Sequence, residues 1–164
     1  ADTLRFTGQI ALKREVTVDL AAQENRLYVA SNDGLLRAFQ VTGSSVAPLW
    51  SRSTVAQPMV PLTQGDRNLY VATQANLSSL DGATGGLRWL VPLSARPAGP
   101  VALYGDHSLV LATEAPELLV VRVADGAEAG RVALRAVPTA GPAVWGDIAL
   151  VGYRDGWVEA VRLK

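Results

Sequence analysis

A unit of about 40 residues that occurs four times constrains the fold of this sequence more than any other feature. Each copy centres on a short apolar triplet. The triplets are Leu27-Tyr28-Val29, Leu69-Tyr70-Val71, Leu109-Val110-Leu111 and Ala149-Leu150-Val151. Their central residues lie 42, 40 and 40 positions apart, so that four units account for all 164 residues. Repeats of this length bury their apolar faces against neighbouring copies, which makes the units interdependent.

Every unit runs through the same succession of apolar segments and polar turns. A segment with proline comes first, and a short turn, usually Gly-Asp, leads into the triplet. A second turn, such as Asn32-Asp33-Gly34 or Arg154-Asp155-Gly156, leads into a third strand. A further turn, such as Thr84-Gly85, leads into a fourth. Asp-Gly between two apolar runs predicts a hairpin with a type I′ turn, because such a turn needs positive φ at both central residues.

Four short antiparallel strands in each unit are typical of a β-propeller blade. We therefore predict an all-β fold, a β-propeller of four four-stranded blades in a single domain over residues 1–164. The blades are expected at about residues 15–54, 55–94, 95–136, and 137–164 together with 1–14.

The two ends of the chain complement each other. The fourth unit stops at Lys164, just after its third strand, whereas Leu4–Leu12 carry a Thr7-Gly8 turn and an apolar strand. We expect residues 1–13 to complete the sheet begun at residues 142–163, because this closure hides an unpaired strand edge. Three architectures stay open: four blades closing alone, a homodimer whose two chains share one eight-bladed ring, or a fragment of a longer propeller.

Composition excludes several classes of function. The 15 acidic and 15 basic residues give no net charge, so no nucleic-acid surface is expected. The absence of cysteine excludes disulfides, thiolate metal sites and cysteine nucleophiles. No run approaches the ~18 apolar residues of a membrane helix, so no direct membrane insertion is expected. The opening ADTLRF fits a processed or trimmed N-terminus.

The stretches YVASNDGLLRAFQVTGSSVAPLW (28–50) and YVATQANLSSLDGATGGLRW (70–89) resemble the repeat of the pyrroloquinoline-quinone-type β-propellers. The resemblance is good in units one and two and in the first half of unit four. Enzymes of this family hold the quinone with calcium, through Glu, Asn and Asp side chains, and often carry a vicinal disulfide. This chain has no cysteine and no repeated acidic cluster, so it is more similar to the non-enzymatic branch. That branch includes the propeller lipoprotein of the bacterial outer-membrane assembly machine.

The resemblance implies a non-enzymatic, WD40-like scaffold for protein–protein interaction, located outside the cytoplasm in the periplasm or cell envelope. The alternative is a sensor for a quinone or small anion, or a remnant of a quinoprotein enzyme, with pyrroloquinoline quinone and calcium at the propeller mouth. A repeat array with no evolved ligand is the third reading. Fold alone does not decide among them.

No catalytic, cofactor-binding or metal-binding residue is predicted. The lone histidine, His107, lies in a turn and has no second imidazole or thiol to share a metal or a proton. The aspartates that precede glycine are expected to serve the turns; they are Asp33, Asp81, Asp125 and Asp155. In the family, the tryptophan that ends a unit docks between blades, which implies packing roles for Trp50 and Trp89.

Two groups of residues are candidates for binding a partner. Each connection between blades is expected to hold a basic residue, and these connections gather at one mouth of a propeller, which would favour an anion or an acidic partner. The basic candidates are Arg14, next to Lys13, and Arg52, Arg96 and Arg135. The aromatic candidates, which could form an exposed patch, are Tyr104, Trp145 and Trp157.

Overall fold

The computed structural model describes residues 9–54 and 56–163, which form fifteen β-strands. The described residues contain no helix, and the all-β prediction is confirmed. In sheet 1 the strands are β1 (Ala21–Gln23), β2 (Arg26–Ser31), β3 (Leu35–Thr42) and β4 (Ser45–Ser53). In sheet 2 they are β5 (Thr63–Gln64), β6 (Asn68–Ala72), β7 (Asn76–Asp81) and β8 (Leu87–Pro92). In sheet 3 they are β9 (Ala102–Tyr104), β10 (Ser108–Thr113), β11 (Glu117–Arg122) and β12 (Glu128–Ala133). In sheet 4 they are β13 (Ala140–Trp145), β14 (Ile148–Gly152) and β15 (Val158–Arg162).

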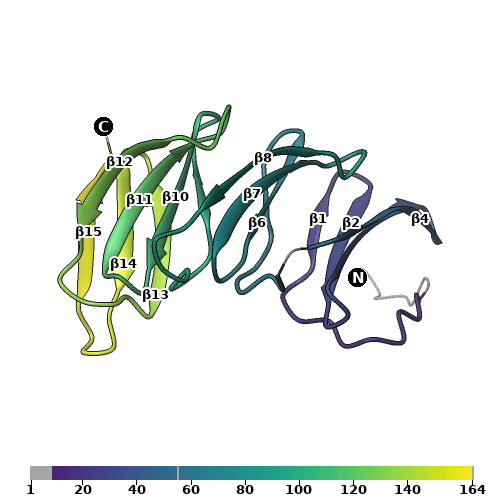
Figure 1. The fold of residues 1–164 in the computed structure, drawn as a ribbon, viewed down its shortest axis with the longest axis horizontal. Coiled ribbons are helices and arrows are strands. Elements are labelled where there is room, and N and C mark those ends of the chain that lie inside the picture. The colour runs from purple at the N-terminus through teal and green to yellow at the C-terminus, as the bar shows by residue number, and fades with distance from the viewer. Residues whose placement is uncertain (1–8, 55, 164) are drawn as a thin grey trace, which may run out of the picture.

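The four sheets lie side by side in one row, with sheet 1 and sheet 4 at opposite ends (Figure 1). Within each sheet the strands are antiparallel and follow the order of the chain. Sheets 1 to 3 have the four strands that the repeat predicts, and sheet 4 has three among the described residues. The chain therefore forms an open arc rather than a ring that the described residues close.

The predicted closing strand is only partly testable. Residues 1–8 lie outside the described residues. Residues 9–13 form no strand and do not pair with β15; Ile10–Leu12 instead line a pocket with residues of β3 and β4 in sheet 1. Within the described residues, the expectation that the N-terminus completes the last sheet of its own chain is therefore not met.

The hairpins occur where Asp-Gly predicts them, but the predicted turn type is wrong. The amide of Gly34 donates to Ser31 O at 3.1 Å, and that of Gly156 donates to Tyr153 O at 3.1 Å. Only the glycine has positive φ, 74° at Gly34, whereas Asp33 does not. The turn is thus a type I turn followed by a left-handed glycine, and the aspartate serves it through its carboxylate.

Three clusters of buried side chains hold the row together, one between each pair of neighbouring sheets. We call the side of a sheet that faces the next sheet its leading side, and the opposite side its trailing side. Alternation along the triplet strand supplies both sides: Tyr70 and Ala72 face sheet 3, whereas Leu69 and Val71 face sheet 1. This double burial explains why the triplets read as continuous apolar runs.

The tryptophans that end units one and two lock neighbouring sheets together, as predicted. Trp50 Nε1 donates to Gly82 O at 3.1 Å, and Trp89 Nε1 donates to Val123 O at 2.8 Å. Each indole lies against a turn glycine of the next sheet, where a side chain has no room. A Cβ on Gly126 would lie 2.7 Å from Trp89 Cε3.

Candidate protein-binding site

One face of the arc collects the connections between sheets and the turns between the second and third strands; we call it the connection face. Each connection starts with a backbone hydrogen bond to the turn of its own sheet. These bonds run from Thr54 N to Gly34 O (2.9 Å), from Leu93 N to Ala75 O (2.8 Å) and from Leu134 N to Pro116 O (2.7 Å). The repeat thereby places the connection and this turn of each unit on a single surface.

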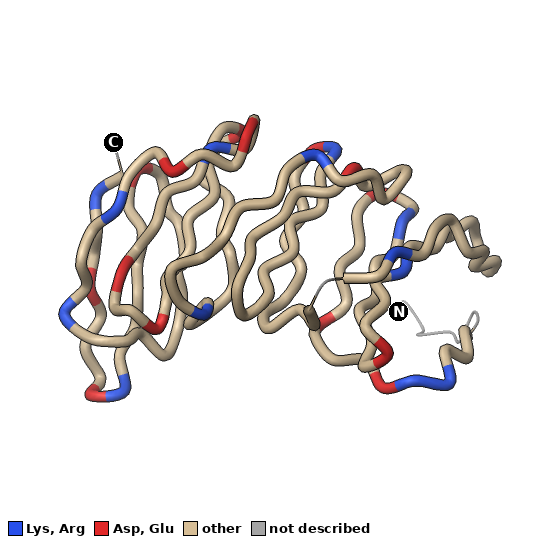
Figure 2. The backbone as a smooth tube through the Cα atoms, viewed as in Figure 1, with Lys and Arg blue, Asp and Glu red and all other residues tan. Residues whose placement is uncertain are grey.

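The structure does not gather the four basic candidates at one mouth. Arg52 is predicted in a connection, and this prediction is wrong. The residue lies within β4, where its Nη1 donates to Gly85 O at 2.9 Å. That bond holds it against the turn between β7 and β8. Arg14, Arg96 and Arg135 do lie in connections, but the open arc spaces them along its length. Figure 2 shows the same dispersion of basic and acidic residues along the whole tube.

Arg135 is the basic candidate with the richest surroundings. Its Nη2 donates to Asp155 Oδ2 at 2.8 Å, across the turn between β14 and β15. Its guanidinium carbon lies 5.2 Å from the ring centroid of Tyr153 and 5.4 Å from that of Trp157. Both separations are within the range of a cation–π contact. The indole of Trp157 is nevertheless 65% exposed, so it stays available to a partner.

Glu159 completes this group, which we call the Arg135 cluster: Arg135, Tyr153, Asp155, Trp157 and Glu159. The hydroxyl of Tyr153 donates to Glu159 Oε2. Burial and this bond to a carboxylate raise the pKa of Tyr153 to about 12. The phenol therefore stays neutral at physiological pH and keeps donating, which fixes the ring beneath the guanidinium.

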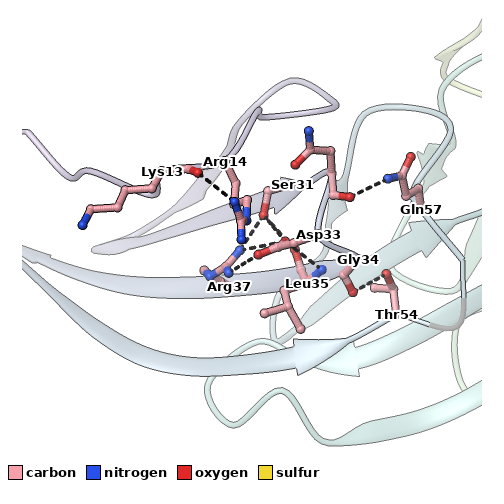
Figure 3. Close-up of polar contacts among 10 residues, drawn as sticks. Lys13, Arg14, Ser31, Asp33, Gly34, Leu35, Arg37, Thr54 and Gln57 are labelled. Carbon is pink, nitrogen blue, oxygen red and sulfur yellow. Dashed lines mark hydrogen bonds and ion pairs between the residues drawn. The ribbon is translucent and has the colours of Figure 1, made fainter.

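Sheet 1 carries a different version of this turn (Figure 3). Arg37 from β3 donates to Asp33 Oδ2 at 2.5 Å, and Ser31 donates to Asp33 Oδ1 at 2.8 Å. These hydrogen bonds, led by the one from Arg37, hold the pKa of Asp33 well below its usual range. Lys13 and Arg14 lie at the same corner, beside Asn32 and Asp33. The residues that line this corner are polar, and Asp33 is paired within it.

The aromatic candidates separate into two environments. Tyr104, at the end of β9, is partly buried and packs into the cluster between sheets 3 and 4. Trp145, at the end of β13, is 77% exposed on the leading side of sheet 4. Tyr104 is thus partly buried between two sheets while Trp145 and Trp157 are exposed, so the three aromatic candidates do not form one exposed patch.

The lone histidine and the acidic side chains form no common site among the described residues. His107 is exposed in the turn between β9 and β10. Among residues 9–54 and 56–163, no group of three or more His, Asp or Glu side chains is placed to hold a metal ion. No helix in this part of the chain is long and apolar enough to cross a membrane.

The sequence prediction missed the carboxylates and the phenol that organise Arg135. A signal for them exists in the repeat register. Glu159 stands where Arg37 stands in unit one, since Val151 pairs with Glu159 as Val29 pairs with Arg37. Asp33 is paired with the arginine four residues later, Arg37, whereas the residue four positions after Asp155 is Glu159. Asp155 is paired instead with Arg135, which lies in the connection before sheet 4.

The chain is similar to known proteins in both sequence pattern and fold. The family model described as outer membrane protein assembly factor BamB matches residues 5–115 and 47–164. The crystal structure of BamB from Moraxella catarrhalis is similar with a TM-score of 0.73 and 22% identity, over 88% of this chain and 45% of that one. The chain thus spans about half the length of that protein. A comparison with curated protein sequences found no match.

Two computationally designed proteins share the fold. Ika4 is similar with a TM-score of 0.82 and 13% identity, over 99% of this chain and 100% of that one. Ika8 is similar with a TM-score of 0.76 and 14% identity, over 90% of this chain and 46% of that one. These likenesses concern the fold of the four sheets. The family model covers nearly all residues, and the chain therefore belongs to the family of the outer membrane protein assembly factor BamB, a family of pyrroloquinoline-quinone-like β-propellers.

Proposed function

We propose that this chain is a non-enzymatic scaffold that binds a protein partner in the bacterial cell envelope, outside the cytoplasm. Membership of the BamB family is the observation that carries this proposal. The family model names an assembly factor of the outer membrane, and assembly factors act by holding other proteins rather than by converting a substrate.

The Arg135 cluster is the surface that we propose for the partner. Tryptophan, tyrosine and arginine are the residues that most often dominate protein–protein binding energy. Here all three are held in one place, because Arg135 lies close to both rings and is ion-paired with Asp155. A partner that covers Trp157 gains its apolar surface without first having to order the side chain.

Site-specific photo-crosslinking in a periplasm-exported form of the chain tests this proposal. A photo-reactive residue at Arg154, an exposed neighbour in the same turn, should capture a discrete protein, whereas one at Arg122 on the opposite face should not. Trp157→Ala should lower the yield about tenfold, in line with the loss of a central aromatic contact. Trp145→Ala, which removes another exposed tryptophan elsewhere on sheet 4, should leave the yield unchanged. Equal yields at both positions would contradict the proposal.

Absence of a quinone cofactor stays a prediction. Titration with pyrroloquinoline quinone and calcium should change neither the absorbance of the quinone nor the melting temperature of the protein. A saturable shift in both would instead favour the sensor or quinoprotein-remnant reading.

A further inference from the structure

The leading side of sheet 4 is built like an interface between blades, yet no described part of the chain covers it. In sheets 1, 2 and 3, one position of the third strand lies at the centre of each interface. The residues at this position are Leu36, Leu77 and Leu118, each at most 1% exposed, and they pair with Ala30, Ala72 and Ala112. The corresponding pair of sheet 4 is Gly152 and Val158. Val158 is 65% exposed.

The innermost strand of sheet 4 repeats this contrast. Trp145 pairs with Ile148 as Tyr104 pairs with Ser108, so the two aromatic residues hold equivalent positions. Tyr104 packs between sheets 3 and 4, whereas Trp145 is 77% exposed. Several neighbouring apolar positions thus share one uncovered face, and isolated exposed apolar residues do not account for such a group.

Sheet 4 also lacks the outer strand that the other sheets have. β15 pairs with β14 on one side, and its other edge has no strand among the described residues. A groove of about 280 Å³ lies beside this edge, between Val161 and Leu163 of sheet 4 and Val132 and Leu118 of sheet 3. An unpaired strand edge next to an apolar groove is a template for an added strand.

The N-terminal segment already holds the place of such a strand, but beside sheet 1. At sheet 2, the last two residues of β4 and Thr54, which follows them, line a pocket with Ser78 and Leu80 of β7 and Leu87 and Leu90 of β8. At sheet 1, Ile10–Leu12 line a pocket with Arg37 and Phe39 of β3 and Pro48 and Ser51 of β4. The residues that line the two pockets occupy equivalent positions in the two sheets. In sheet 2, Leu80 pairs with Leu87 and Ser78 pairs with Leu90. In sheet 1, the equivalent pairs are Phe39 with Pro48 and Arg37 with Ser51. Relative to sheet 1, Ile10–Leu12 therefore lie where the outer strand of a preceding blade lies relative to sheet 2.

We propose that two copies of this chain associate end to end. The leading side of sheet 4 in one copy packs against the trailing side of sheet 1 in the other. Gln9–Leu12 of the second copy then become the outer strand beside β15 of the first. The occupant is a second copy because sheet 1 of the same chain lies at the opposite end of the row (Figure 1). The junction continues the interfaces between blades that the chain forms three times internally.

Two such junctions related by a two-fold axis close two arcs into one ring. Val158 adjoins Trp157 in sequence but lies on the leading side of sheet 4, whereas Tyr153 and Glu159 lie on its trailing side. Trp145, at the end of β13 away from the connection face, tests the junction without altering the Arg135 cluster. Failure of the dimer and failure of the partner site are therefore distinguishable.

Light-scattering mass measurement across a dilution series tests the proposal. The wild-type chain should give a particle of about twice 17.3 kDa that dissociates on dilution. Val158→Asp should weaken this association roughly thirtyfold or more, because it places a charge at the centre of an apolar junction. Trp145→Glu should act in the same way. Val137→Asp, at a 44% exposed valine in the connection before sheet 4, is the matched control and should leave the dimer intact.

A second readout separates the junction from other modes of association. Because Trp145 becomes buried in the dimer, the tryptophan emission should shift to shorter wavelength as concentration rises, and Trp145→Phe should abolish that shift. Circular dichroism of the Val158→Asp variant establishes that it stays folded. A mass near 17.3 kDa at every concentration would overturn the proposal, as would a dimer that both Val158→Asp and Trp145→Glu leave intact.

Discussion

At the scale of single residues, the turn aspartates do their work through their carboxylates rather than through their backbone angles. Asp33 accepts hydrogen bonds from Arg37, Ser31 and the amide of Leu35, all of which favour its charged form. Asp125 is held in the same way by Arg122 and by the amide of Ala127. An Asp-Gly pair in this repeat is thus a small electrostatic unit as well as a hairpin signal.

The Asp33 carboxylate should make the stability of the chain depend on acidity. Its folded-state pKa lies below that of the unfolded chain, about 3.9, so its contribution is complete above that pH and is lost as the pH falls through the lower, folded value. Asp33→Asn should therefore lower the melting temperature at neutral pH, and its difference from the wild type should shrink on acidification. Thermal melts by circular dichroism over a pH series measure this.

A matched control for that experiment is Asp66→Asn. The Asp66 side chain is 97% exposed, and its nearest basic group, Arg67 Nε, is 4.0 Å away. This variant should differ little from the wild type at any pH. If Asp33→Asn changed the melting temperature by the same amount at all pH values, the ion pair would not be the cause.

At the scale of strands and sheets, each contact of a unit-ending tryptophan with the next sheet pairs an indole with a glycine. The indole and the glycine come from different units. Trp50 packs on Gly85, and Trp89 packs on Gly126. The glycine is needed twice over, because Gly126 combines a φ of 75° with the absence of room for a side chain.

Substitution of alanine at two glycines should separate these requirements. Gly126→Ala incurs both the backbone strain and the collision with Trp89, whereas Gly105→Ala incurs the strain alone, since φ is 57° and nothing lies within 4 Å of its Cβ position. We expect Gly105→Ala to cost about 1 kcal/mol and Gly126→Ala about 2 to 4 kcal/mol of unfolding free energy. Urea denaturation of both variants gives the difference. Equal losses would show that the indole contact contributes little.

The repeat predicted the strands well because its signal is local. Alternation in Leu69-Tyr70-Val71 and the flanking turns suffices to place β6, and the same argument holds for the other triplets. The turn type was not predictable from Asp-Gly alone, because Gly34 takes positive φ without any change at Asp33. The repeat pattern of unit one ends at Trp50, and it therefore predicts Arg52 in the connection that follows. The prediction is wrong because β4 continues to Ser53.

At the scale of the whole molecule, the sequence predicted the number of sheets but not how the arc ends. The repeat specifies which side of each sheet is apolar, and this holds for sheet 4 as for the others. What covers the last apolar side depends on where the N-terminal segment lies, and no local pattern decides that. The Arg135 cluster was equally hidden, since it joins a connection to a hairpin twenty residues later.

The strands differ in how many strands and sheets pack against them, so their backbone amides should differ in protection from hydrogen exchange. Strands β7 and β11 have partner strands on both sides and neighbouring sheets on both faces. Among the described residues, β15 has one partner strand and one packed face. Amide hydrogen exchange of dilute protein should therefore be fastest in β15 among the third strands. Peptide-level mass spectrometry measures this order. Slower exchange in β15 than in β7 would show that another segment covers its edge in the dilute protein.

The tryptophan locks also have a direction, and this direction matters while the chain is being made. Trp50 reaches forward to the carbonyl of Gly82, 32 residues later, and Trp89 reaches forward to that of Val123, 34 residues later. On a ribosome that adds about 5 to 20 residues each second, every finished blade waits roughly 2 to 7 seconds for its successor's turn to emerge. The arc is thus expected to assemble in the order of translation, with one outer strand always exposed at the growing end.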